Sequence, residues 1–308
     1  MAELNSTELE LLKIIADMDG TPDGAYNIRA NGALSSRHVT ENIDIRTKSD
    51  KQGIEVVIRP NTKGETVHIP VIIDASGVND LVYNDFIIGE NADVTIMAGC
   101  GIHNCGSDES RHDGIHTFFV GKNAKVRYIE RHYGAGDGTG GKNMNPTTIV
   151  NVAEGGYIEM ETTQIKGIDN TERVTRATVG ENGTLIIKEK LMTHGTQTAG
   201  SDFSVELNGE KSSANVISRS VARENSRQVF KSNIIGNSAC TGHTECDAII
   251  MDNAQVSAIP EISANHIDAS LIHEAAIGKI AGEQLIKLMT LGLTPEQAEE
   301  EIVNGFLK

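Results

Sequence analysis

A thiol, an imidazole and a carboxylate stand near the end of the chain at a spacing that could build a site for a metal ion or for sulfur. Cys246 lies in the segment 244–251, and His273 and Glu274 follow about one structural repeat later. In a regularly coiled chain, residues one repeat apart lie above one another, so the three side chains could meet. Thiolate, imidazole and carboxylate together form a donor set suited to iron or zinc. The competing interpretation is that Cys246 is a small buried hydrophobe.

A denser group of candidate side chains lies between residues 100 and 116. It contains two cysteines and three histidines, namely Cys100, His103, Cys105, His112 and His116. Their spacing matches no zinc-finger pattern, and the glycines among them suggest a mobile loop. A thiol near imidazoles could be reactive through a lowered pKa.

Short β-branched runs recur from about residue 25 onward, and helical spacing is missing from this region. The turns at 89–94, 121–126, 153–158 and 180–185 follow one plan, with Asn or Gly at the corner, and recur about every 30 residues. Asn and Gly tolerate the positive φ that a tight corner needs. A β-helix and a sandwich of short hairpins both fit. The longer turns, and apolar runs without clean alternation, favour the parallel β-helix.

Helices are expected at both ends of this strand-rich body. Residues 5–18 carry an apolar face and a capping residue at Asn5 or Thr7. Residues 278–291 and 295–307 form an amphipathic pair, and residues 294–297 make a capping box with Pro at the first helical position. The expected organisation is an N-terminal helix at 1–24, a β-helix core at 25–270 and a C-terminal helical domain at 271–308. That domain could cap the coil or present an apolar face to a partner.

Composition excludes several classes of function. The chain has 308 residues and a formal net charge of −16, so it lacks the basic footprint that nucleic-acid binding needs. No apolar run approaches the roughly 20 residues of a membrane span, and the N-terminus carries no signal-peptide pattern. Four cysteines are too few for a secreted disulfide scaffold, which favours a cytoplasmic chain with free, metal-bound or reactive thiols.

Enzyme fingerprints are missing around these candidates. The sequence contains no G-x-S-x-G or H-E-x-x-H pattern, and the Gly-rich segment 134–142 lacks the spacing of a phosphate-binding loop. Two alternatives remain open. A β-helix enzyme that cleaves acidic polysaccharides would need aromatic residues for sugar stacking, and these make up only 4% of the chain. A permease subunit of an ABC transporter would need membrane spans.

The candidate residues also resemble those of a known family. The C-terminal core of the SufB/SufD iron–sulfur cluster assembly proteins is similar to this chain at Cys246-Asp247, Pro260-Glu261-Ile262, His273-Glu274-Ala275 and Gly305-Phe306. The resemblance runs from about residue 89 to the end and is most specific from Cys246 onward. It is closer to SufB than to SufD, because Glu274 follows His273.

This resemblance implies a mainly β fold, a right-handed parallel β-helix with a short N-terminal helix and a C-terminal helical hairpin. It implies a scaffold and not an enzyme, with sulfur accepted on Cys100 and a transient iron–sulfur cluster held by Cys246, Glu274 and His273. The C-terminal helices would dock on a SufC-type ABC ATPase in a SufBCD-type complex, and two cores would dimerise side by side. A cysteine desulfurase or sulfur carrier would supply sulfur. Neither nucleic acid nor a membrane is an expected partner.

The chain also departs from the family pattern. It is short and lacks most of the family's larger N-terminal region, so flavin binding is not expected. No separate SufD-like subunit is evident, which favours a homodimer over a heterodimer with such a subunit. Cys105 and the histidines around it, His103, His112 and His116, are not part of the family motif, so their role is left open.

Overall fold

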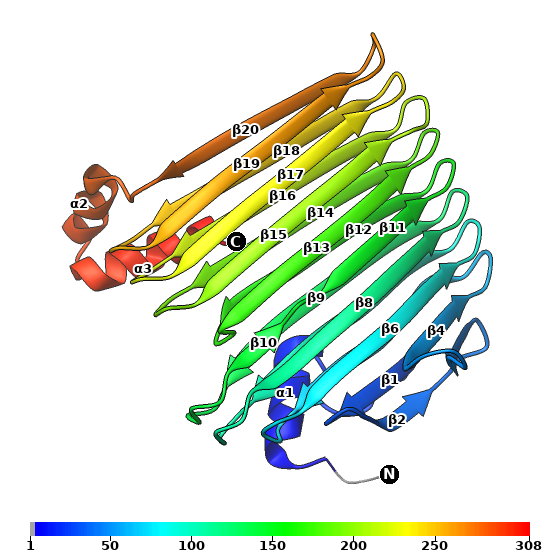
Figure 1. Cartoon of the computed structure of the whole chain (residues 1–308), viewed down its shortest axis with the longest axis horizontal. Helices are drawn as coiled ribbons and strands as arrows, with labels where there is room; N and C mark the ends of the chain where they lie inside the picture. The colour runs from blue at the N-terminus through cyan, green and yellow to red at the C-terminus, as the bar shows by residue number, and fades with distance from the viewer. Residues whose placement is uncertain (1–3) are drawn as a thin grey trace.

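The computed structural model describes residues 4–308 and shows a parallel β-helix built from two facing sheets (Figure 1). In each regular coil a strand of sheet A leads through a loop to a strand of sheet B, and a tight turn returns the chain to sheet A. Sheet A has the order β2 (Ala33–His38), β1 (Ala25–Ala30), β5 (Lys63–Ile73), β7 (Asp93–His103), β9 (Lys125–Ala135), β12 (Tyr157–Lys166), β14 (Thr184–Thr193), β16 (Ser213–Ala222), β18 (Thr241–Ile250) and β20 (Ser270–Gly278). Sheet B has the order β19 (Gln255–Ala264), β17 (Arg227–Gly236), β15 (Thr198–Leu207), β13 (Asn170–Val179), β10 (Lys142–Met144), β8 (Ser110–Val120), β6 (Asn79–Ile88), β4 (Gly53–Ile58) and β3 (Ile43–Thr47), and β11 (Thr147–Val152) pairs with β13 and β8.

Neighbouring coils pair in parallel. Tyr157 of β12, for example, lies between Lys125 of β9 and Thr184 of β14. Only the first coil departs from this arrangement among the described residues, because β1 is antiparallel to β2 and β3 is antiparallel to β4. The predicted β-helix is therefore confirmed, and the sandwich of hairpins is excluded.

The predicted corners form tight turns between sheet B and sheet A. Asn91, Asn123 and Asn182 adopt φ of 55°, 55° and 54°, and Gly155 takes the equivalent place with φ of 65°. Few other residue types adopt this left-handed conformation without strain, which explains why Asn or Gly recurs there. The corners also connect the coils, since the backbone amide of Asn91 donates to the carbonyl of Lys122 at 2.9 Å.

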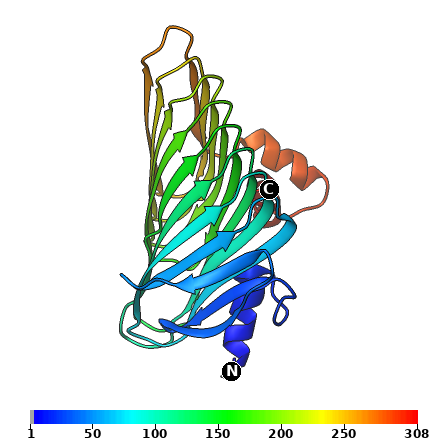
Figure 2. The same cartoon turned by 90° about the vertical axis from the view of Figure 1, so that its right-hand side faces the viewer.

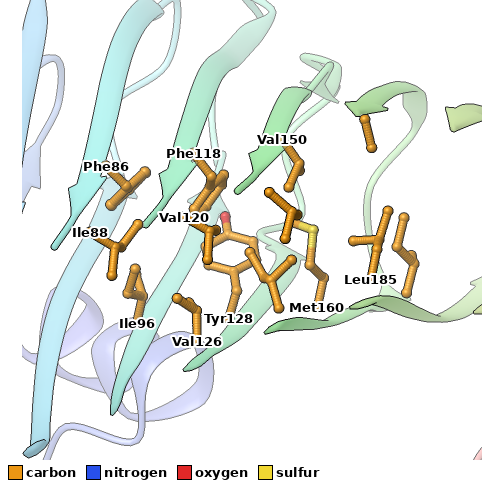
Figure 3. Packing of buried hydrophobic residues seen from close by; sticks show 14 of the residues in the cluster. Phe86, Ile88, Ile96, Phe118, Val120, Val126, Tyr128, Val150, Met160 and Leu185 are labelled. Atoms are coloured by element: carbon orange, nitrogen blue, oxygen red, sulfur yellow. The ribbon is translucent and has the colours of Figure 1, made fainter. Parts of the chain in front are cut away.

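The interior of the β-helix is divided lengthwise into an apolar half and a polar half. Beside the tight turns, the two sheets face each other with rows of apolar side chains (Figure 3), which include Phe86, Phe118, Val150, Ile96, Val126 and Met160. Beside the loops, a small apolar cluster surrounds Ile73 and Ile102. Many other inward positions there carry buried polar side chains, among them Ser110, His112, His116, Glu130, His132, Gln164, Arg173, Glu189, Ser201 and Ser218. The apolar half supplies the hydrophobic stabilisation, and the polar half is available for chemistry.

Helix α1 (Ser6–Ala16) lies against the outer face of sheet A at the N-terminal coils (Figure 2). Asn5 caps it as predicted, in a reciprocal capping box with Glu8. Leu12 and Ile15 are fully buried and pack in one cluster with Ile72 of β5. The helix therefore covers this part of the wall of the β-helix.

Helices α2 (Gly282–Thr290) and α3 (Pro295–Phe306) follow the last strand. The predicted capping box is present, with Thr294 and Gln297 as reciprocal partners. The helical part begins at Gly282 and not at residue 271, because residues 270–278 still form a strand that pairs with β18. Within residues 4–308, no helix combines the length and apolar character needed to cross a membrane.

Candidate functional site

Cys246 lies on the inner face of β18, inside the β-helix. Its side chain is 1% exposed and belongs to the main hydrophobic cluster. Its register partner on β16 is Ser218. Burial, together with the nearby carboxylates of Glu189 and Asp247, raises the pKa of the thiol to about 12. The thiol is therefore protonated at neutral pH and needs a base or a metal ion to become a ligand.

The structure separates Glu274 from Cys246. Cys246 pairs with Ala275 on β20, whereas Glu274 pairs with Glu245. Successive residues of a strand face opposite sides of a sheet, so Glu274 lies on the outer face. Its side chain is 67% exposed, and its Oε2 is 3.6 Å from His243 Nε2. Within one chain the expected meeting of this carboxylate with the thiol does not occur, because the register places Cys246 one residue beyond Glu274.

His273 shares the inner face with Cys246. It pairs with Thr244, which lies two residues before Cys246 on β18. Its Nδ1 is buried, with no hydrogen-bond partner among the described residues. Burial lowers the pKa of His273, and the neighbouring His243 lowers it further. A neutral imidazole with an unengaged ring nitrogen is a competent metal ligand.

Cys100 lies on the inner face of β7, where it packs in a small apolar cluster with Val71, Ile73, Ile102, Met144 and Ile168. It is 2% exposed, and burial, with Asp80 and Glu130 nearby, raises the pKa of its thiol well above the ordinary value. A small cavity of about 20 Å³ borders it, whose lining includes Asn84, His112, Gly114, His116, Glu130 and His132. A space of this size holds about one water molecule.

A series of buried polar side chains leads from this cavity toward Cys246. Arg173 Nη1 donates to Glu130 Oε2 at 2.6 Å, and Arg173 Nε lies 3.6 Å from Glu189 Oε1. Ser218 Oγ donates to Glu189 Oε2 at 2.7 Å, and Ser218 is the register partner of Cys246. Sequence reasoning did not find this series, which connects the surroundings of Cys100 with those of Cys246.

Within the series, Glu130 and Arg173 form a pair of opposite charges. Burial by itself would raise the pKa of Glu130, but Arg173 and His132 outweigh it and hold that pKa well below its usual range. Burial alone would likewise lower the pKa of Arg173, but Glu130 and Glu189 raise it. Both partners therefore stay ionised inside the β-helix, which is possible only because each charge has a counter-charge in contact.

The segment rich in histidine and cysteine is divided between the interior and the surface. His112 and His116 are buried on β8. His103 Nε2, by contrast, lies 3.0 Å from the Sγ of Cys105, in an exposed pair. Of the four cysteines, only Cys105 is exposed.

The last coil leaves an open end. Strands β19 and β20 stand at the ends of their sheets, so each has one unpaired edge. Large apolar side chains are exposed on and between these strands, namely Ile259, Ile262, Ile267, Ile272 and Ile277. An unpaired edge with apolar neighbours is a template for association with another chain.

Of the two C-terminal helices, α3 packs on sheet A and α2 stays exposed. Val303 and Leu307 of the α3 end pack with Val221 of β16, and Arg223 Nη2 lies 2.7 Å from Glu299 Oε1. Helix α2 buries none of its residues. Its exposed apolar side chains and that of its C-cap are Ile286, Met289 and Leu291.

Comparisons with known proteins place this architecture in a family. The family model described as SUF system FeS cluster assembly, SufBD core domain, matches residues 72–306. An iron–sulfur cluster assembly SufBD family protein of Archaeoglobus fulgidus is 31% identical over 229 residues, which are 74% of this chain and 60% of the relative. A second, of Methanocaldococcus jannaschii, is 30% identical over 243 residues, which are 78% of this chain and 76% of the relative.

The resemblance to this family is therefore confirmed, and the alternative of a carbohydrate-active enzyme is not favoured. A third relative, of Methanothermobacter thermautotrophicus, is 30% identical over 237 residues, and the chain spans 56% of its length. The chain belongs to the SufBD family of iron–sulfur cluster assembly proteins.

Proposed function

We propose that this chain is a SufB-like scaffold on which an iron–sulfur cluster is built from delivered iron and sulfur. Cys100 accepts sulfur, and Cys246 receives it and becomes a ligand of the nascent cluster. The observation that carries the proposal is the series of buried polar side chains between the cavity at Cys100 and Ser218, beside Cys246. Buried charges cost free energy. A line of them between two thiols is better explained by passage of a polar species than by stability.

Sulfur reaches Cys100 as a persulfide. The acceptor thiolate attacks the outer sulfur of the donor persulfide, the sulfur–sulfur bond breaks, and the donor leaves as a thiolate, so no oxidant is needed. A cysteine desulfurase or a sulfur carrier supplies the first persulfide. All four cysteines are free, in keeping with work in a reducing compartment such as the cytoplasm.

The cluster site is completed at the open end by a second subunit, either another copy of this chain or a SufD-like protein. Cys246 and His273 share the inner face, and Glu274 stands outside on the same strand as His273. Within residues 4–308, no three His, Cys, Asp or Glu side chains are arranged to hold a metal ion. Pairing of the unpaired edges would bring in further ligands. Mixed thiolate, imidazole and carboxylate ligation suits a cluster that must be released again.

Helix α2 and the C-cap residue Leu291 provide the docking surface for the partner ATPase. Their apolar side chains face solvent, whereas α3 is fixed on sheet A. ATP hydrolysis takes place in that partner, and its motion opens the interface between the two subunits. Pull-down with the ATPase tests this: the double variant Ile286→Glu and Leu291→Glu should no longer retain it, and equal retention by the parent and this variant would place the docking surface elsewhere.

Anaerobic reconstitution with iron and sulfide tests the cluster site. The parent chain is compared with Cys246→Ala and with Cys240→Ala, since Cys240 is also buried in the main cluster. We expect Cys246→Ala to lose most of the bound iron and sulfide and Cys240→Ala to retain it. Equal cluster binding by Cys246→Ala and the parent would refute the assignment.

A further inference from the structure

Asp80 and His112 are arranged as a support and a base next to Cys100. His112 Nδ1 lies 3.2 Å from Asp80 Oδ2, and the Asp80 side chain is completely buried. Asp80 is fixed in turn by Arg29 Nη2 and Gln52 Nε2, each donating to its Oδ1 at 2.8 Å. Because Nδ1 of His112 faces a carboxylate, the proton of the neutral imidazole sits on Nδ1, and Nε2 carries the lone pair.

The Nε2 of His112 borders the cavity at Cys100. Gly114 lines this cavity together with Cys100, and a β-carbon placed on Gly114 would stand 3.4 Å from His112 Nε2. His112 is 7% exposed, and among the described residues its ring makes its hydrogen bond through Nδ1, to Asp80. Both ring nitrogens of the neighbouring His116 are engaged, by contrast, with Asn84 and with a tyrosine hydroxyl. His132, the third imidazole of the lining, pairs with Cys100, but its Nδ1 lies 3.4 Å from Gln164 Oε1 and its Nε2 lies 3.5 Å from Glu130 Oε1. Of the three imidazoles, only that of His112 has a ring nitrogen without such a neighbour.

Cys100 cannot accept sulfur without such a base. The reactive form of a cysteine is the thiolate. Burial and the carboxylates of Asp80 and Glu130 raise the pKa of the Cys100 thiol, so it stays protonated at neutral pH. The proton must therefore be taken by a group that reaches the same enclosed space, and His112 borders that space.

We propose that His112, oriented by Asp80, is the base that deprotonates Cys100 during sulfur acceptance, and that the cavity receives the incoming sulfur atom. The inference rests on the sulfur-accepting role of Cys100 proposed above. The thiol proton passes from Sγ to His112 Nε2, and the Cys100 sulfur attacks the outer sulfur of the donor persulfide. The donor's sulfur–sulfur bond breaks, and the donor leaves as a thiolate. His112 is a catalytic residue in this step, and Asp80 is a positioning residue.

Loading of the full chain with inorganic polysulfide under anaerobic conditions tests the proposal. Mass spectrometry of the peptide that contains Cys100 measures the rate at which one sulfur atom is added, and Cys100→Ala shows the signal from the other thiols. We expect His112→Gln to load at least about 100-fold more slowly than the parent, the lower end of what a positioned base contributes. The loading rate of Asp80→Asn should fall between those of the parent and His112→Gln. His194→Gln, a histidine away from the cavity, should load like the parent.

A second measurement separates a base from a structural role. Added imidazole should restore part of the loading rate of His112→Gly, which a merely structural histidine would not show, and absence of this rescue would count against a base. If the His112 variants melt below the assay temperature, Asp80→Asn carries the test, and loading at the parent rate overturns the inference. Equal loading of Cys100 in the parent and His112→Gln also overturns it. A parent that takes no sulfur on Cys100 would instead refute the proposed sulfur acceptor itself.

Discussion

The surroundings of the two candidate thiols, Cys100 and Cys246, differ between the two ends of the β-helix. Around Cys100 helix α1 covers the outer face of sheet A. It can pack directly on the strand because Gly99 and Gly101 have no side chains on that face. A β-carbon on Gly99 would stand 2.9 Å from the carbonyl oxygen of Ile15. Cys246 is equally buried, but it lies one strand from the open end, because the next strand, β20, has an unpaired edge. The comparison teaches that one fold can enclose a thiol behind a helix near one end and leave unpaired strand edges at the other end.

The largest expected effect comes from the buried charges of the enclosed region. Arg173→Met leaves Glu130 and Glu189 buried without their counter-charge, and we expect a loss of about 3–5 kcal/mol in the free energy of unfolding. The control Arg127→Met removes an exposed partner of Glu161 and should cost about 1 kcal/mol or less. Chemical denaturation measures both. Similar losses in the two variants would mean that the interior is hydrated and not enclosed.

The next effect concerns the contact between α1 and the strand of Cys100. In Gly99→Ala the new β-carbon would meet the carbonyl oxygen of Arg131 at 2.6 Å and that of Ile15 at 2.9 Å. We expect a loss of up to about 3 kcal/mol in the free energy of unfolding and faster amide exchange in α1. Gly278→Ala, in the exposed strand β20, has nothing within 4 Å and serves as the control. Unchanged exchange in α1 would show that the helix adapts to the side chain.

A smaller effect concerns the pH dependence of the free energy of unfolding, which should differ between the two ends of the β-helix. Burial lowers the pKa of His116 to about 4, whereas an unfolded histidine titrates near pH 6.5. The unfolded chain therefore binds an extra proton between these values, and stability falls as the pH drops through this window. Going from pH 7 to pH 5 should cost the parent about 2 kcal/mol more than His116→Gln. The corresponding loss at half-buried His273 should be smaller. Denaturation at both pH values measures the difference, and equal losses in parent and variant would contradict it.

The smallest effect on folding is expected at the open end, where the effect on assembly is large. Ile272 is 52% exposed on β20, so Ile272→Glu should change the free energy of unfolding by no more than about 0.5 kcal/mol. The same change should abolish self-association or binding of a SufD-like subunit, as measured by sedimentation. Phe119→Glu, on the outer face of sheet B and 46% exposed, should leave association intact. If Phe119→Glu disrupts assembly and Ile272→Glu does not, the interface lies on that face.

The fold was predictable because its signals are local. Several corners carry Asn or Gly where the backbone takes positive φ, as at Asn91, Asn123, Gly155 and Asn182. The capping residues Asn5 and Thr294 mark two of the helix starts. Such signals act over a few residues and survive in a single sequence. The end of the last strand near residue 278 was harder to predict from sequence, because the apolar residues of β20 are compatible with either a strand or a helix.

The geometry of the site depends on register, which the sequence does not display. Cys246 and Glu274 are separated by about one coil, but the pairing of Cys246 with Ala275 places them on opposite faces. A change of one residue in the length of a turn shifts the register by one and moves a side chain to the opposite face of the sheet. The buried charged residues could have been found by continuing the alternation of inward and outward positions from the apolar part of each strand into its other half. In β9 the inward positions include Val126, Tyr128 and Glu130.

The lengthwise division of the interior has a consequence for how this architecture can change. Every regular coil contributes a complete cross-section of the β-helix. Insertion of one whole coil would move the two thiols about 4.8 Å further apart, the spacing of neighbouring strands, and would leave the surroundings of each unaltered. The distance between the two thiols can thus evolve in steps of one repeat, independently of the residues around either of them.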